Sequence, residues 1–166
     1  MNILIILSFP VAFLIHDLEE IVVQHKWMLT HKDDLARRFP RLQPMIRHLS
    51  SLTPKAFTIA VLEELLMLIL ATVYYLVGGP YAMEVWTALF VAFSIHLVVH
   101  VGQGIIIRGY VPGLITSILL LPYSYYVINC ICQEMSCRKL FLLGVIGFVV
   151  IAVNLWFAHW LGKRFS

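Results

Sequence analysis

Five long apolar segments separated by short polar connections make up most of the chain. They cover residues 3–23, 56–77, 85–107, 111–130 and 140–161. Each is about 20 residues long, and at a rise of about 1.5 Å per residue such a helix crosses the roughly 30 Å hydrocarbon core of a bilayer. The pattern therefore predicts an all-α fold, a polytopic membrane bundle of five transmembrane helices.

The longest polar connection, residues 25–52, has an amphipathic pattern of its own. Trp27, Leu35 and Phe39 alternate with acidic and basic residues, which is typical of a short helix lying on anionic headgroups. Pro40 should end this helix, because proline has no backbone N–H to continue it. We therefore expect one interfacial helix in addition to the five spans.

The composition excludes a soluble domain. The 166 residues are 61% hydrophobic and only 13% charged, and the mean hydropathy is +0.90. A chain of this length has no room for a second domain, so residues 1–166 should form a single integral membrane domain. The net charge of +3 arises from one basic connection, and we expect no nucleic-acid partner.

The distribution of basic residues predicts the orientation. On a five-helix topology, ten of the twelve Lys and Arg residues fall on the side that contains residues 24–55. The positive-inside rule assigns that side to the cytoplasm. We therefore expect the N-terminus outside and the C-terminus inside, with the chain in the cytoplasmic membrane of a bacterium.

Five carboxylates lie within the first two apolar segments, where no Lys or Arg neutralises them. A charge at such a depth costs roughly 2.5–3.5 kcal/mol on insertion scales, so it indicates a functional site. Three histidines lie in equally apolar surroundings, and the helical rise places the glutamates and histidines in one layer of the inner half of the membrane. The eight residues are His16, Asp17, Glu19, Glu20, Glu63, Glu64, His96 and His100.

The spacing of these residues places several of them on shared helix faces. His16 and Glu20 stand at i and i+4, as do His96 and His100, and Glu19 stands one residue before Glu20. Neighbouring Glu63 and Glu64 diverge by about 100°, so one can bind a ligand while the other orients a histidine. The predicted metal ligands are His16, Glu19, Glu63, His96 and His100, the predicted general bases are Glu20 and Glu64, and the predicted supporting residues are Asp17, Gln103 and Asn154.

The negative charge of the four glutamates in this layer can be neutralised in two ways. Two divalent ions would cancel the four glutamates, and a Glu/His set from facing helices is how helical bundles build such centres. Protonation of some glutamates is the competing solution. One or two Zn²⁺, Fe or Mn²⁺ ions suit the mixed nitrogen and oxygen ligands, whereas Mg²⁺ and Ca²⁺ prefer oxygen alone.

A family resemblance rests on the same residues. His16-x-x-Glu19-Glu20, followed by the Glu63 pair and by His96-x-x-x-His100, resembles the small bacterial membrane-protein family named for its HxxEE motif. The resemblance spans nearly the whole chain. It implies a multi-helix membrane protein with a metal or catalytic site at His16, Glu19 and Glu20, and it implies no particular reaction.

Two classes of function fit this pattern. The first is a metal-dependent enzyme that hydrolyses or transfers a group on a lipid or lipid-linked substrate, or a di-iron enzyme that oxidises a lipid with the same ligands. The second is metal-free proton chemistry, as in an isoprenoid isomerase or cyclase, a glutamate-type intramembrane hydrolase or a small proton-coupled transporter. A transport pathway through five short helices would require a homo-oligomer, so we rank the enzymes above transport.

Overall fold

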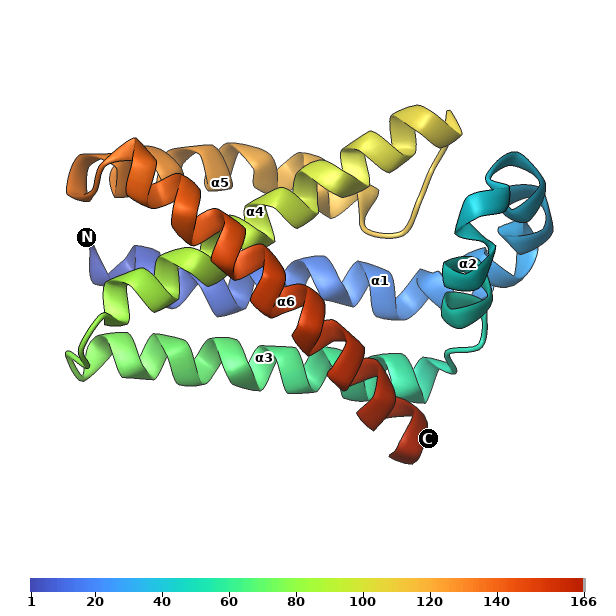
Figure 1. Ribbon diagram of the computed structural model, residues 1–166, viewed down its shortest axis with the longest axis horizontal. Helices are drawn as coiled ribbons and strands as arrows, with labels where there is room; N and C mark the ends of the chain where they lie inside the picture. The colour runs from blue at the N-terminus through green and yellow to red at the C-terminus, as the bar shows by residue number, and fades with distance from the viewer. Residues whose placement is uncertain (166) are drawn as a thin grey trace.

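The computed structural model describes residues 1–165, and these residues are almost entirely helical, without any strand (Figure 1). Within residues 1–165, six α-helices and one short 3-10 helix follow one another. Their bounds are α1 (Ile3–Arg38), η1 (Pro40–Leu42), α2 (Gln43–Ser50), α3 (Pro54–Leu76), α4 (Ala82–Ile107), α5 (Leu114–Glu134) and α6 (Cys137–Phe165).

The prediction of an all-helical membrane bundle is confirmed in its main outline. Within the described residues, four helices are long and apolar enough to cross a membrane, namely α3, α4, α5 and α6. The first helix is not one of them. Its apolar part carries Asp17, Glu19 and Glu20, so a fifth span does not follow from length and composition.

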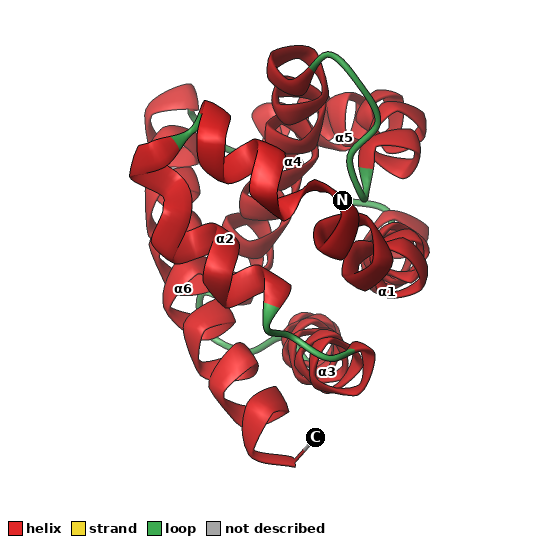
Figure 2. Ribbon diagram, turned by 90° about the vertical axis from the view of Figure 1, so that its right-hand side faces the viewer, coloured by secondary structure: helices red, strands yellow, loops and turns green. Residues whose placement is uncertain are grey.

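The predicted interfacial helix is the second half of α1 rather than a separate element. No glycine or proline lies between residues 23 and 38, so the helix continues from the predicted span without a break. It ends at Arg38, with Phe39 as its C-cap directly before Pro40, as the sequence predicts. Its apolar face is covered by α2, where Met28 and Leu35 pack against Ile46. Figure 2 shows α2 lying across the end of the bundle between α1 and α6.

The last helix closes the bundle by crossing α3 and α4 (Figure 1). Gly147 makes this crossing close, because a Cβ at that position would collide with the backbone carbonyl of Ala88 on α4. The opposite face of α6 is exposed and apolar, with Phe141 and Val145 among its uncovered side chains. A large uncovered apolar surface of this kind indicates a membrane protein.

A layer of aromatic side chains packs between α1 and α4, next to the histidines of the predicted polar layer. Phe9 packs edge-on against Trp86 and Phe90, with ring centroids 5.4 and 5.1 Å apart. Phe93 follows one turn later on α4, and its ring lies 5.9 Å from that of His16. The apolar core therefore ends, and the predicted polar layer begins, within a single helical turn.

Candidate metal centre

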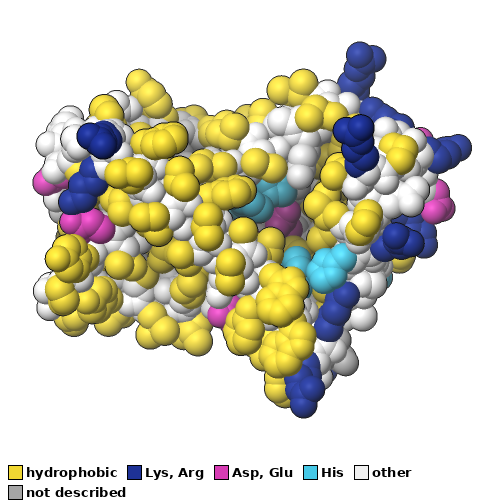
Figure 3. All heavy atoms as spheres, viewed as in Figure 1, with side chains coloured by type: hydrophobic (Ala, Val, Ile, Leu, Met, Phe, Trp, Pro, Cys, Tyr) yellow, Lys and Arg dark blue, Asp and Glu magenta, His cyan; other side chains and the backbone are white. Residues whose placement is uncertain are grey.

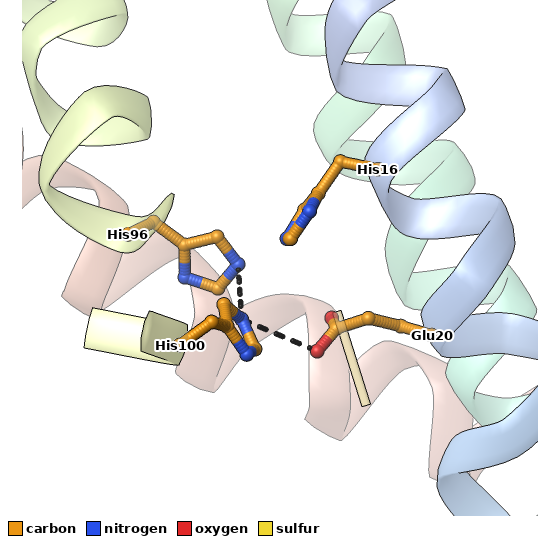
Figure 4. Close-up of side chains that lie close together, drawn as sticks. All are labelled: His16, Glu20, His96 and His100. Carbon is orange, nitrogen blue, oxygen red and sulfur yellow. Dashed lines mark hydrogen bonds and ion pairs between the residues drawn. The ribbon is translucent and has the colours of Figure 1, made fainter. Parts of the chain in front are cut away.

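Three histidines and one glutamate from α1 and α4 converge at one point (Figure 4). His16 and Glu20 project from α1, and His96 and His100 project from α4. Each offers one ligand atom, and the four atoms all lie within 4.8 Å of one another. A group of this size and composition can hold a divalent metal ion.

The i, i+4 spacing on each helix produces the convergence. It places both side chains of a helix on one face, one turn apart. His100 Nε2 lies 3.0 Å from His96 Nε2 and 3.3 Å from Glu20 Oε1. The rings of His96 and His100 have centroids 4.4 Å apart, and each lies 5.0 Å from the ring of His16. Three imidazoles therefore enclose the point that Glu20 faces.

The proton on the His16 ring is placed by Thr116. The Thr116 hydroxyl donates its proton to Glu19 Oε2 at 2.6 Å, so the same oxygen accepts from His16 Nδ1 at 3.0 Å. His16 must then carry its proton on Nδ1 and present the lone pair of Nε2. That Nε2 atom is buried and has no hydrogen-bond partner. A buried lone pair without a donor is what a metal ligand needs.

Gly113 allows the loop before α5 to lie directly on the histidine rings. Its φ of 78° is in the left-handed region that favours glycine. A Cβ here would stand 2.9 Å from His16 Cε1 and 3.0 Å from His100 Cε1. The backbone of the loop therefore covers the centre so closely that a residue with a side chain at position 113 would collide with the histidine rings.

Glu19, a predicted metal ligand, lies outside the group of four and binds the start of α5. Its carboxylate accepts from the backbone N–H groups of Ile115 and Thr116 at 3.4 and 2.8 Å, and from the Tyr110 hydroxyl at 2.7 Å. Gly113 offers α5 no side-chain cap, so Glu19 satisfies donors that the helix terminus leaves open. In this structure Glu19 supports His16 through Thr116.

Glu63 also lies apart from the group of four. Its Oε2 accepts from the side-chain amide of Asn154 at 2.9 Å, which joins α3 to α6. The sequence predicted Glu63 as a metal ligand and Asn154 as a supporting residue of the same site, whereas the structure pairs the two with each other on the α3–α6 side of the molecule.

A cavity of about 780 Å³ opens beside the centre and contains the remaining predicted carboxylates. Asp17 and Glu64 line it together with Glu20, His96 and His100, and the predicted supporting residue Gln103 lies on its wall. Asp17 and Glu64 are each at most 9% exposed, and both interact electrostatically with Glu20. Figure 3 shows the hollow between α4 and α6, with histidine side chains at its edge and acidic side chains inside.

A second histidine pair lines the end of the cavity near α2. His48 Nε2 lies 3.1 Å from His159 Nδ1, and Lys163 Nζ lies 3.4 Å from His48 Nδ1. Burial, and then the charge of Lys163, lowers the pKa of His48. Lysine has no acceptor atom, so Lys163 donates to His48 and His48 donates to His159.

Sequence reasoning did not assign Thr116, Tyr110 or Gly113 to the site, although it predicts a tight turn that contains Tyr110 and Gly113. None of them is a metal-ligand residue type at a telling spacing; Tyr110 lies in the predicted loop before residue 111, and Gly113 and Thr116 lie near the start of the predicted span 111–130. One signal could have pointed to them. The helix that follows Gly113 begins without a capping side chain, so an acceptor from elsewhere in the chain has to bind its first backbone N–H groups.

A family model described as "Protein of unknown function with HXXEE motif" matches residues 7–127, which include all four residues of the centre. No curated protein and no solved structure matches the chain.

Proposed function

The chain belongs to the HXXEE-motif family, and we propose that it is a membrane metalloenzyme whose divalent ion is held by His16, Glu20, His96 and His100. The observation that carries the proposal is the buried Nε2 atom of His16, which has no hydrogen-bond partner. Thr116 fixes the tautomer of the ring, so this nitrogen presents a lone pair. Zn²⁺ and Fe are the best candidates for three imidazoles and one carboxylate, and Mn²⁺ is the next.

The cavity supports a lipid or lipid-linked substrate. Apart from the polar group at the centre, its walls are mainly apolar, with Phe13, Leu68 and Phe93 beside the site and Trp156 farther along α6. It opens sideways between α4 and α6, whose outer faces are apolar (Figure 3). A substrate dissolved in the bilayer would therefore reach the ion without passing through water.

The reaction that best fits this arrangement is hydrolysis or transfer at an ester or phosphoester. An ion bound here would supply a Lewis acid and would make water a nucleophile near neutral pH. Glu64, which is buried and lines the same cavity, would take the proton from the water. For a carboxylic ester, the water oxygen bonds to the carbonyl carbon, the bond to the alcohol oxygen breaks, and Glu64 returns the proton to the alkoxide that leaves.

The topology belongs to the same proposal. We place the first half of α1 in the bilayer as a fifth span, with the N-terminus outside and the C-terminus in the cytoplasm. The Lys and Arg side chains that gather at the α2 end of the molecule support this orientation (Figure 3). The centre would then lie in the inner half of the membrane.

Metal analysis of the purified protein tests the proposal directly. Wild-type protein should contain at least one equivalent of Zn or Fe per chain, and His96→Ala should lose it. His31→Ala is the matched control, because this histidine is exposed and bonded to its own helix. Wild-type protein that contains no metal after gentle purification would overturn the proposal and favour proton transfer by the buried carboxylates.

A further inference from the structure

We infer that the lipid bound in the cavity carries a phosphate in its headgroup, and that this phosphate binds at the α2 end of the cavity, beside His48, His159 and Lys163. The inference rests on the proposed function, because it names the class of lipid on which the enzyme would act. It uses none of the four ligands of the metal centre, so the two proposals can fail separately.

A chain of hydrogen bonds at this end leaves one N–H donor for a ligand. Lys163 Nζ donates to Ser51 Oγ at 2.8 Å and to His48 Nδ1 at 3.4 Å. His48 therefore carries its proton on Nε2 and donates it to His159 Nδ1 at 3.1 Å. His159 must then carry its own proton on Nε2. Its side chain lines the cavity, so an anion in the cavity can accept this hydrogen bond.

Positive charge lies beside this donor. Burial, and then the charge of Lys163, lowers the pKa of His48, so the imidazole stays neutral and the charge stays on the lysine. The segments that supply these side chains, residues 35–62 and 135–165, contain no Asp or Glu. An anion is therefore the ligand that complements this end of the cavity, and phosphate is suited to it because it accepts several charge-assisted hydrogen bonds.

The surroundings favour a phosphate that belongs to a lipid. Apolar side chains line the cavity near this end, among them Met28, Leu49 and Leu155, and a dissolved anion would leave them uncovered. Basic side chains gather at the same end of the molecule (Figure 3). On the proposed topology this end lies at the cytoplasmic surface of the bilayer, where the anionic headgroups are found.

A phosphate bound here would serve recognition and would not be the group that reacts. The ring of His159 lies 6.5 Å from that of Phe57. Phe57 precedes Glu64 by two helical turns, about 10 Å along α3. The phosphate would therefore lie well away from the proposed proton acceptor, which favours hydrolysis of a carboxylic ester nearer the acyl chains.

Binding of short-chain lipids to the purified protein tests this subsite by isothermal titration calorimetry. Wild type should bind dihexanoyl phosphatidic acid at least about tenfold more tightly than dihexanoylglycerol, which has the same chains without the phosphate. Lys163→Gln and His159→Phe should each lose most of this preference. Arg164→Gln is the matched control and should keep it, because it removes the same charge from a side chain that lies over the Trp160 ring.

Thermal unfolding without lipid shows whether each variant folds. Lys163 is exposed, so Lys163→Gln keeps the test valid if the buried His159→Phe variant folds poorly. Equal affinities of wild type for the two lipids would overturn the subsite, and so would an equal loss of preference in Arg164→Gln. Inorganic phosphate that binds as tightly as phosphatidic acid would overturn the assignment to a lipid.

Metal content separates this inference from the proposed function. His159→Phe should contain as much metal as wild type, and His96→Ala should keep its preference for phosphatidic acid after losing the metal. Wild-type protein that prefers phosphatidic acid but contains no metal would overturn the metalloenzyme and support the subsite. Bound metal without the preference would do the reverse.

Discussion

Replacing Thr116 by valine should weaken metal binding although Thr116 is not a ligand. Valine has nearly the same shape, so the change removes only the hydroxyl that accepts from His16 Nδ1 at 3.0 Å and donates to Glu19 at 2.6 Å. In the metal-free protein the His16 ring can move its proton to the other nitrogen. With an ion on Nε2 it cannot, so the buried Nδ1–H is left without an acceptor.

The size of the effect follows from that difference between the two states. A buried donor without a partner costs about 1–3 kcal/mol. Because the cost falls on the metal-bound form, affinity should drop about 10–100-fold, the range found for partners that orient metal-bound histidines. Glu19 keeps the N–H of Thr116 at 2.8 Å and the Tyr110 hydroxyl at 2.7 Å, so the start of α5 should stay in place.

Titration of metal-free protein with Zn²⁺ against a chromogenic chelator measures the effect. Thr116→Ser is the control, because it retains the hydroxyl and should bind within about threefold of wild type. A Thr116→Val protein that folds normally and binds Zn²⁺ as tightly as wild type would refute the assignment of the His16 tautomer. Equal losses in both variants would show that the methyl group matters and the hydrogen bond does not.

Two further predictions concern the loop between α4 and α5. Gly113→Ala should reduce Zn²⁺ affinity by at least about tenfold, because the new Cβ would stand 2.9 Å from the His16 ring. Gly109→Ala is the control and should bind Zn²⁺ normally, because the space around Gly109 is open. Equal affinities of the two variants would contradict this account. Burial and the Glu19 carboxylate raise the pKa of the Tyr110 phenol. The protonated phenol therefore contributes to folding stability below its unfolded pKa near 10, and this contribution is lost as the pH rises through the pKa of the folded state. Glu19→Gln should lower that pKa and add one tyrosine to the early part of an ultraviolet titration, and an unchanged curve would count against the hydrogen bond.

Most of the fold could be predicted from the sequence, because it depends on local properties. Apolar segments of about 20 residues give α3, α4, α5 and α6 nearly within their predicted limits. The end of α1 before Pro40 was predicted for the same kind of reason. The continuity of α1 was missed, since an amphipathic pattern that follows a span looks the same whether or not the helix is interrupted between them.

The candidate site was predicted in part. His16, Glu20, His96 and His100 could be grouped because a helix places residues four apart on one face, and the structure brings all four together. Glu20 was predicted as a base and lies among the ligand atoms, whereas Glu19 was predicted as a ligand and binds the start of α5. Adjacent residues on a helix point about 100° apart, and only the neighbouring helices determine which of the two faces the site.

By itself, the sequence determined that apolar helices would carry carboxylates and histidines, because hydropathy depends only on the order of residues. That these residues share one depth in the membrane stays a prediction from the helical rise. The tertiary structure decided which carboxylates bind residues of other helices and which line the cavity. Glu19 and Glu63 meet partners from α5 and α6, while Asp17 and Glu64 face the cavity. Those partners are 91 or more residues away along the chain, so only the packing of the helices could bring them together.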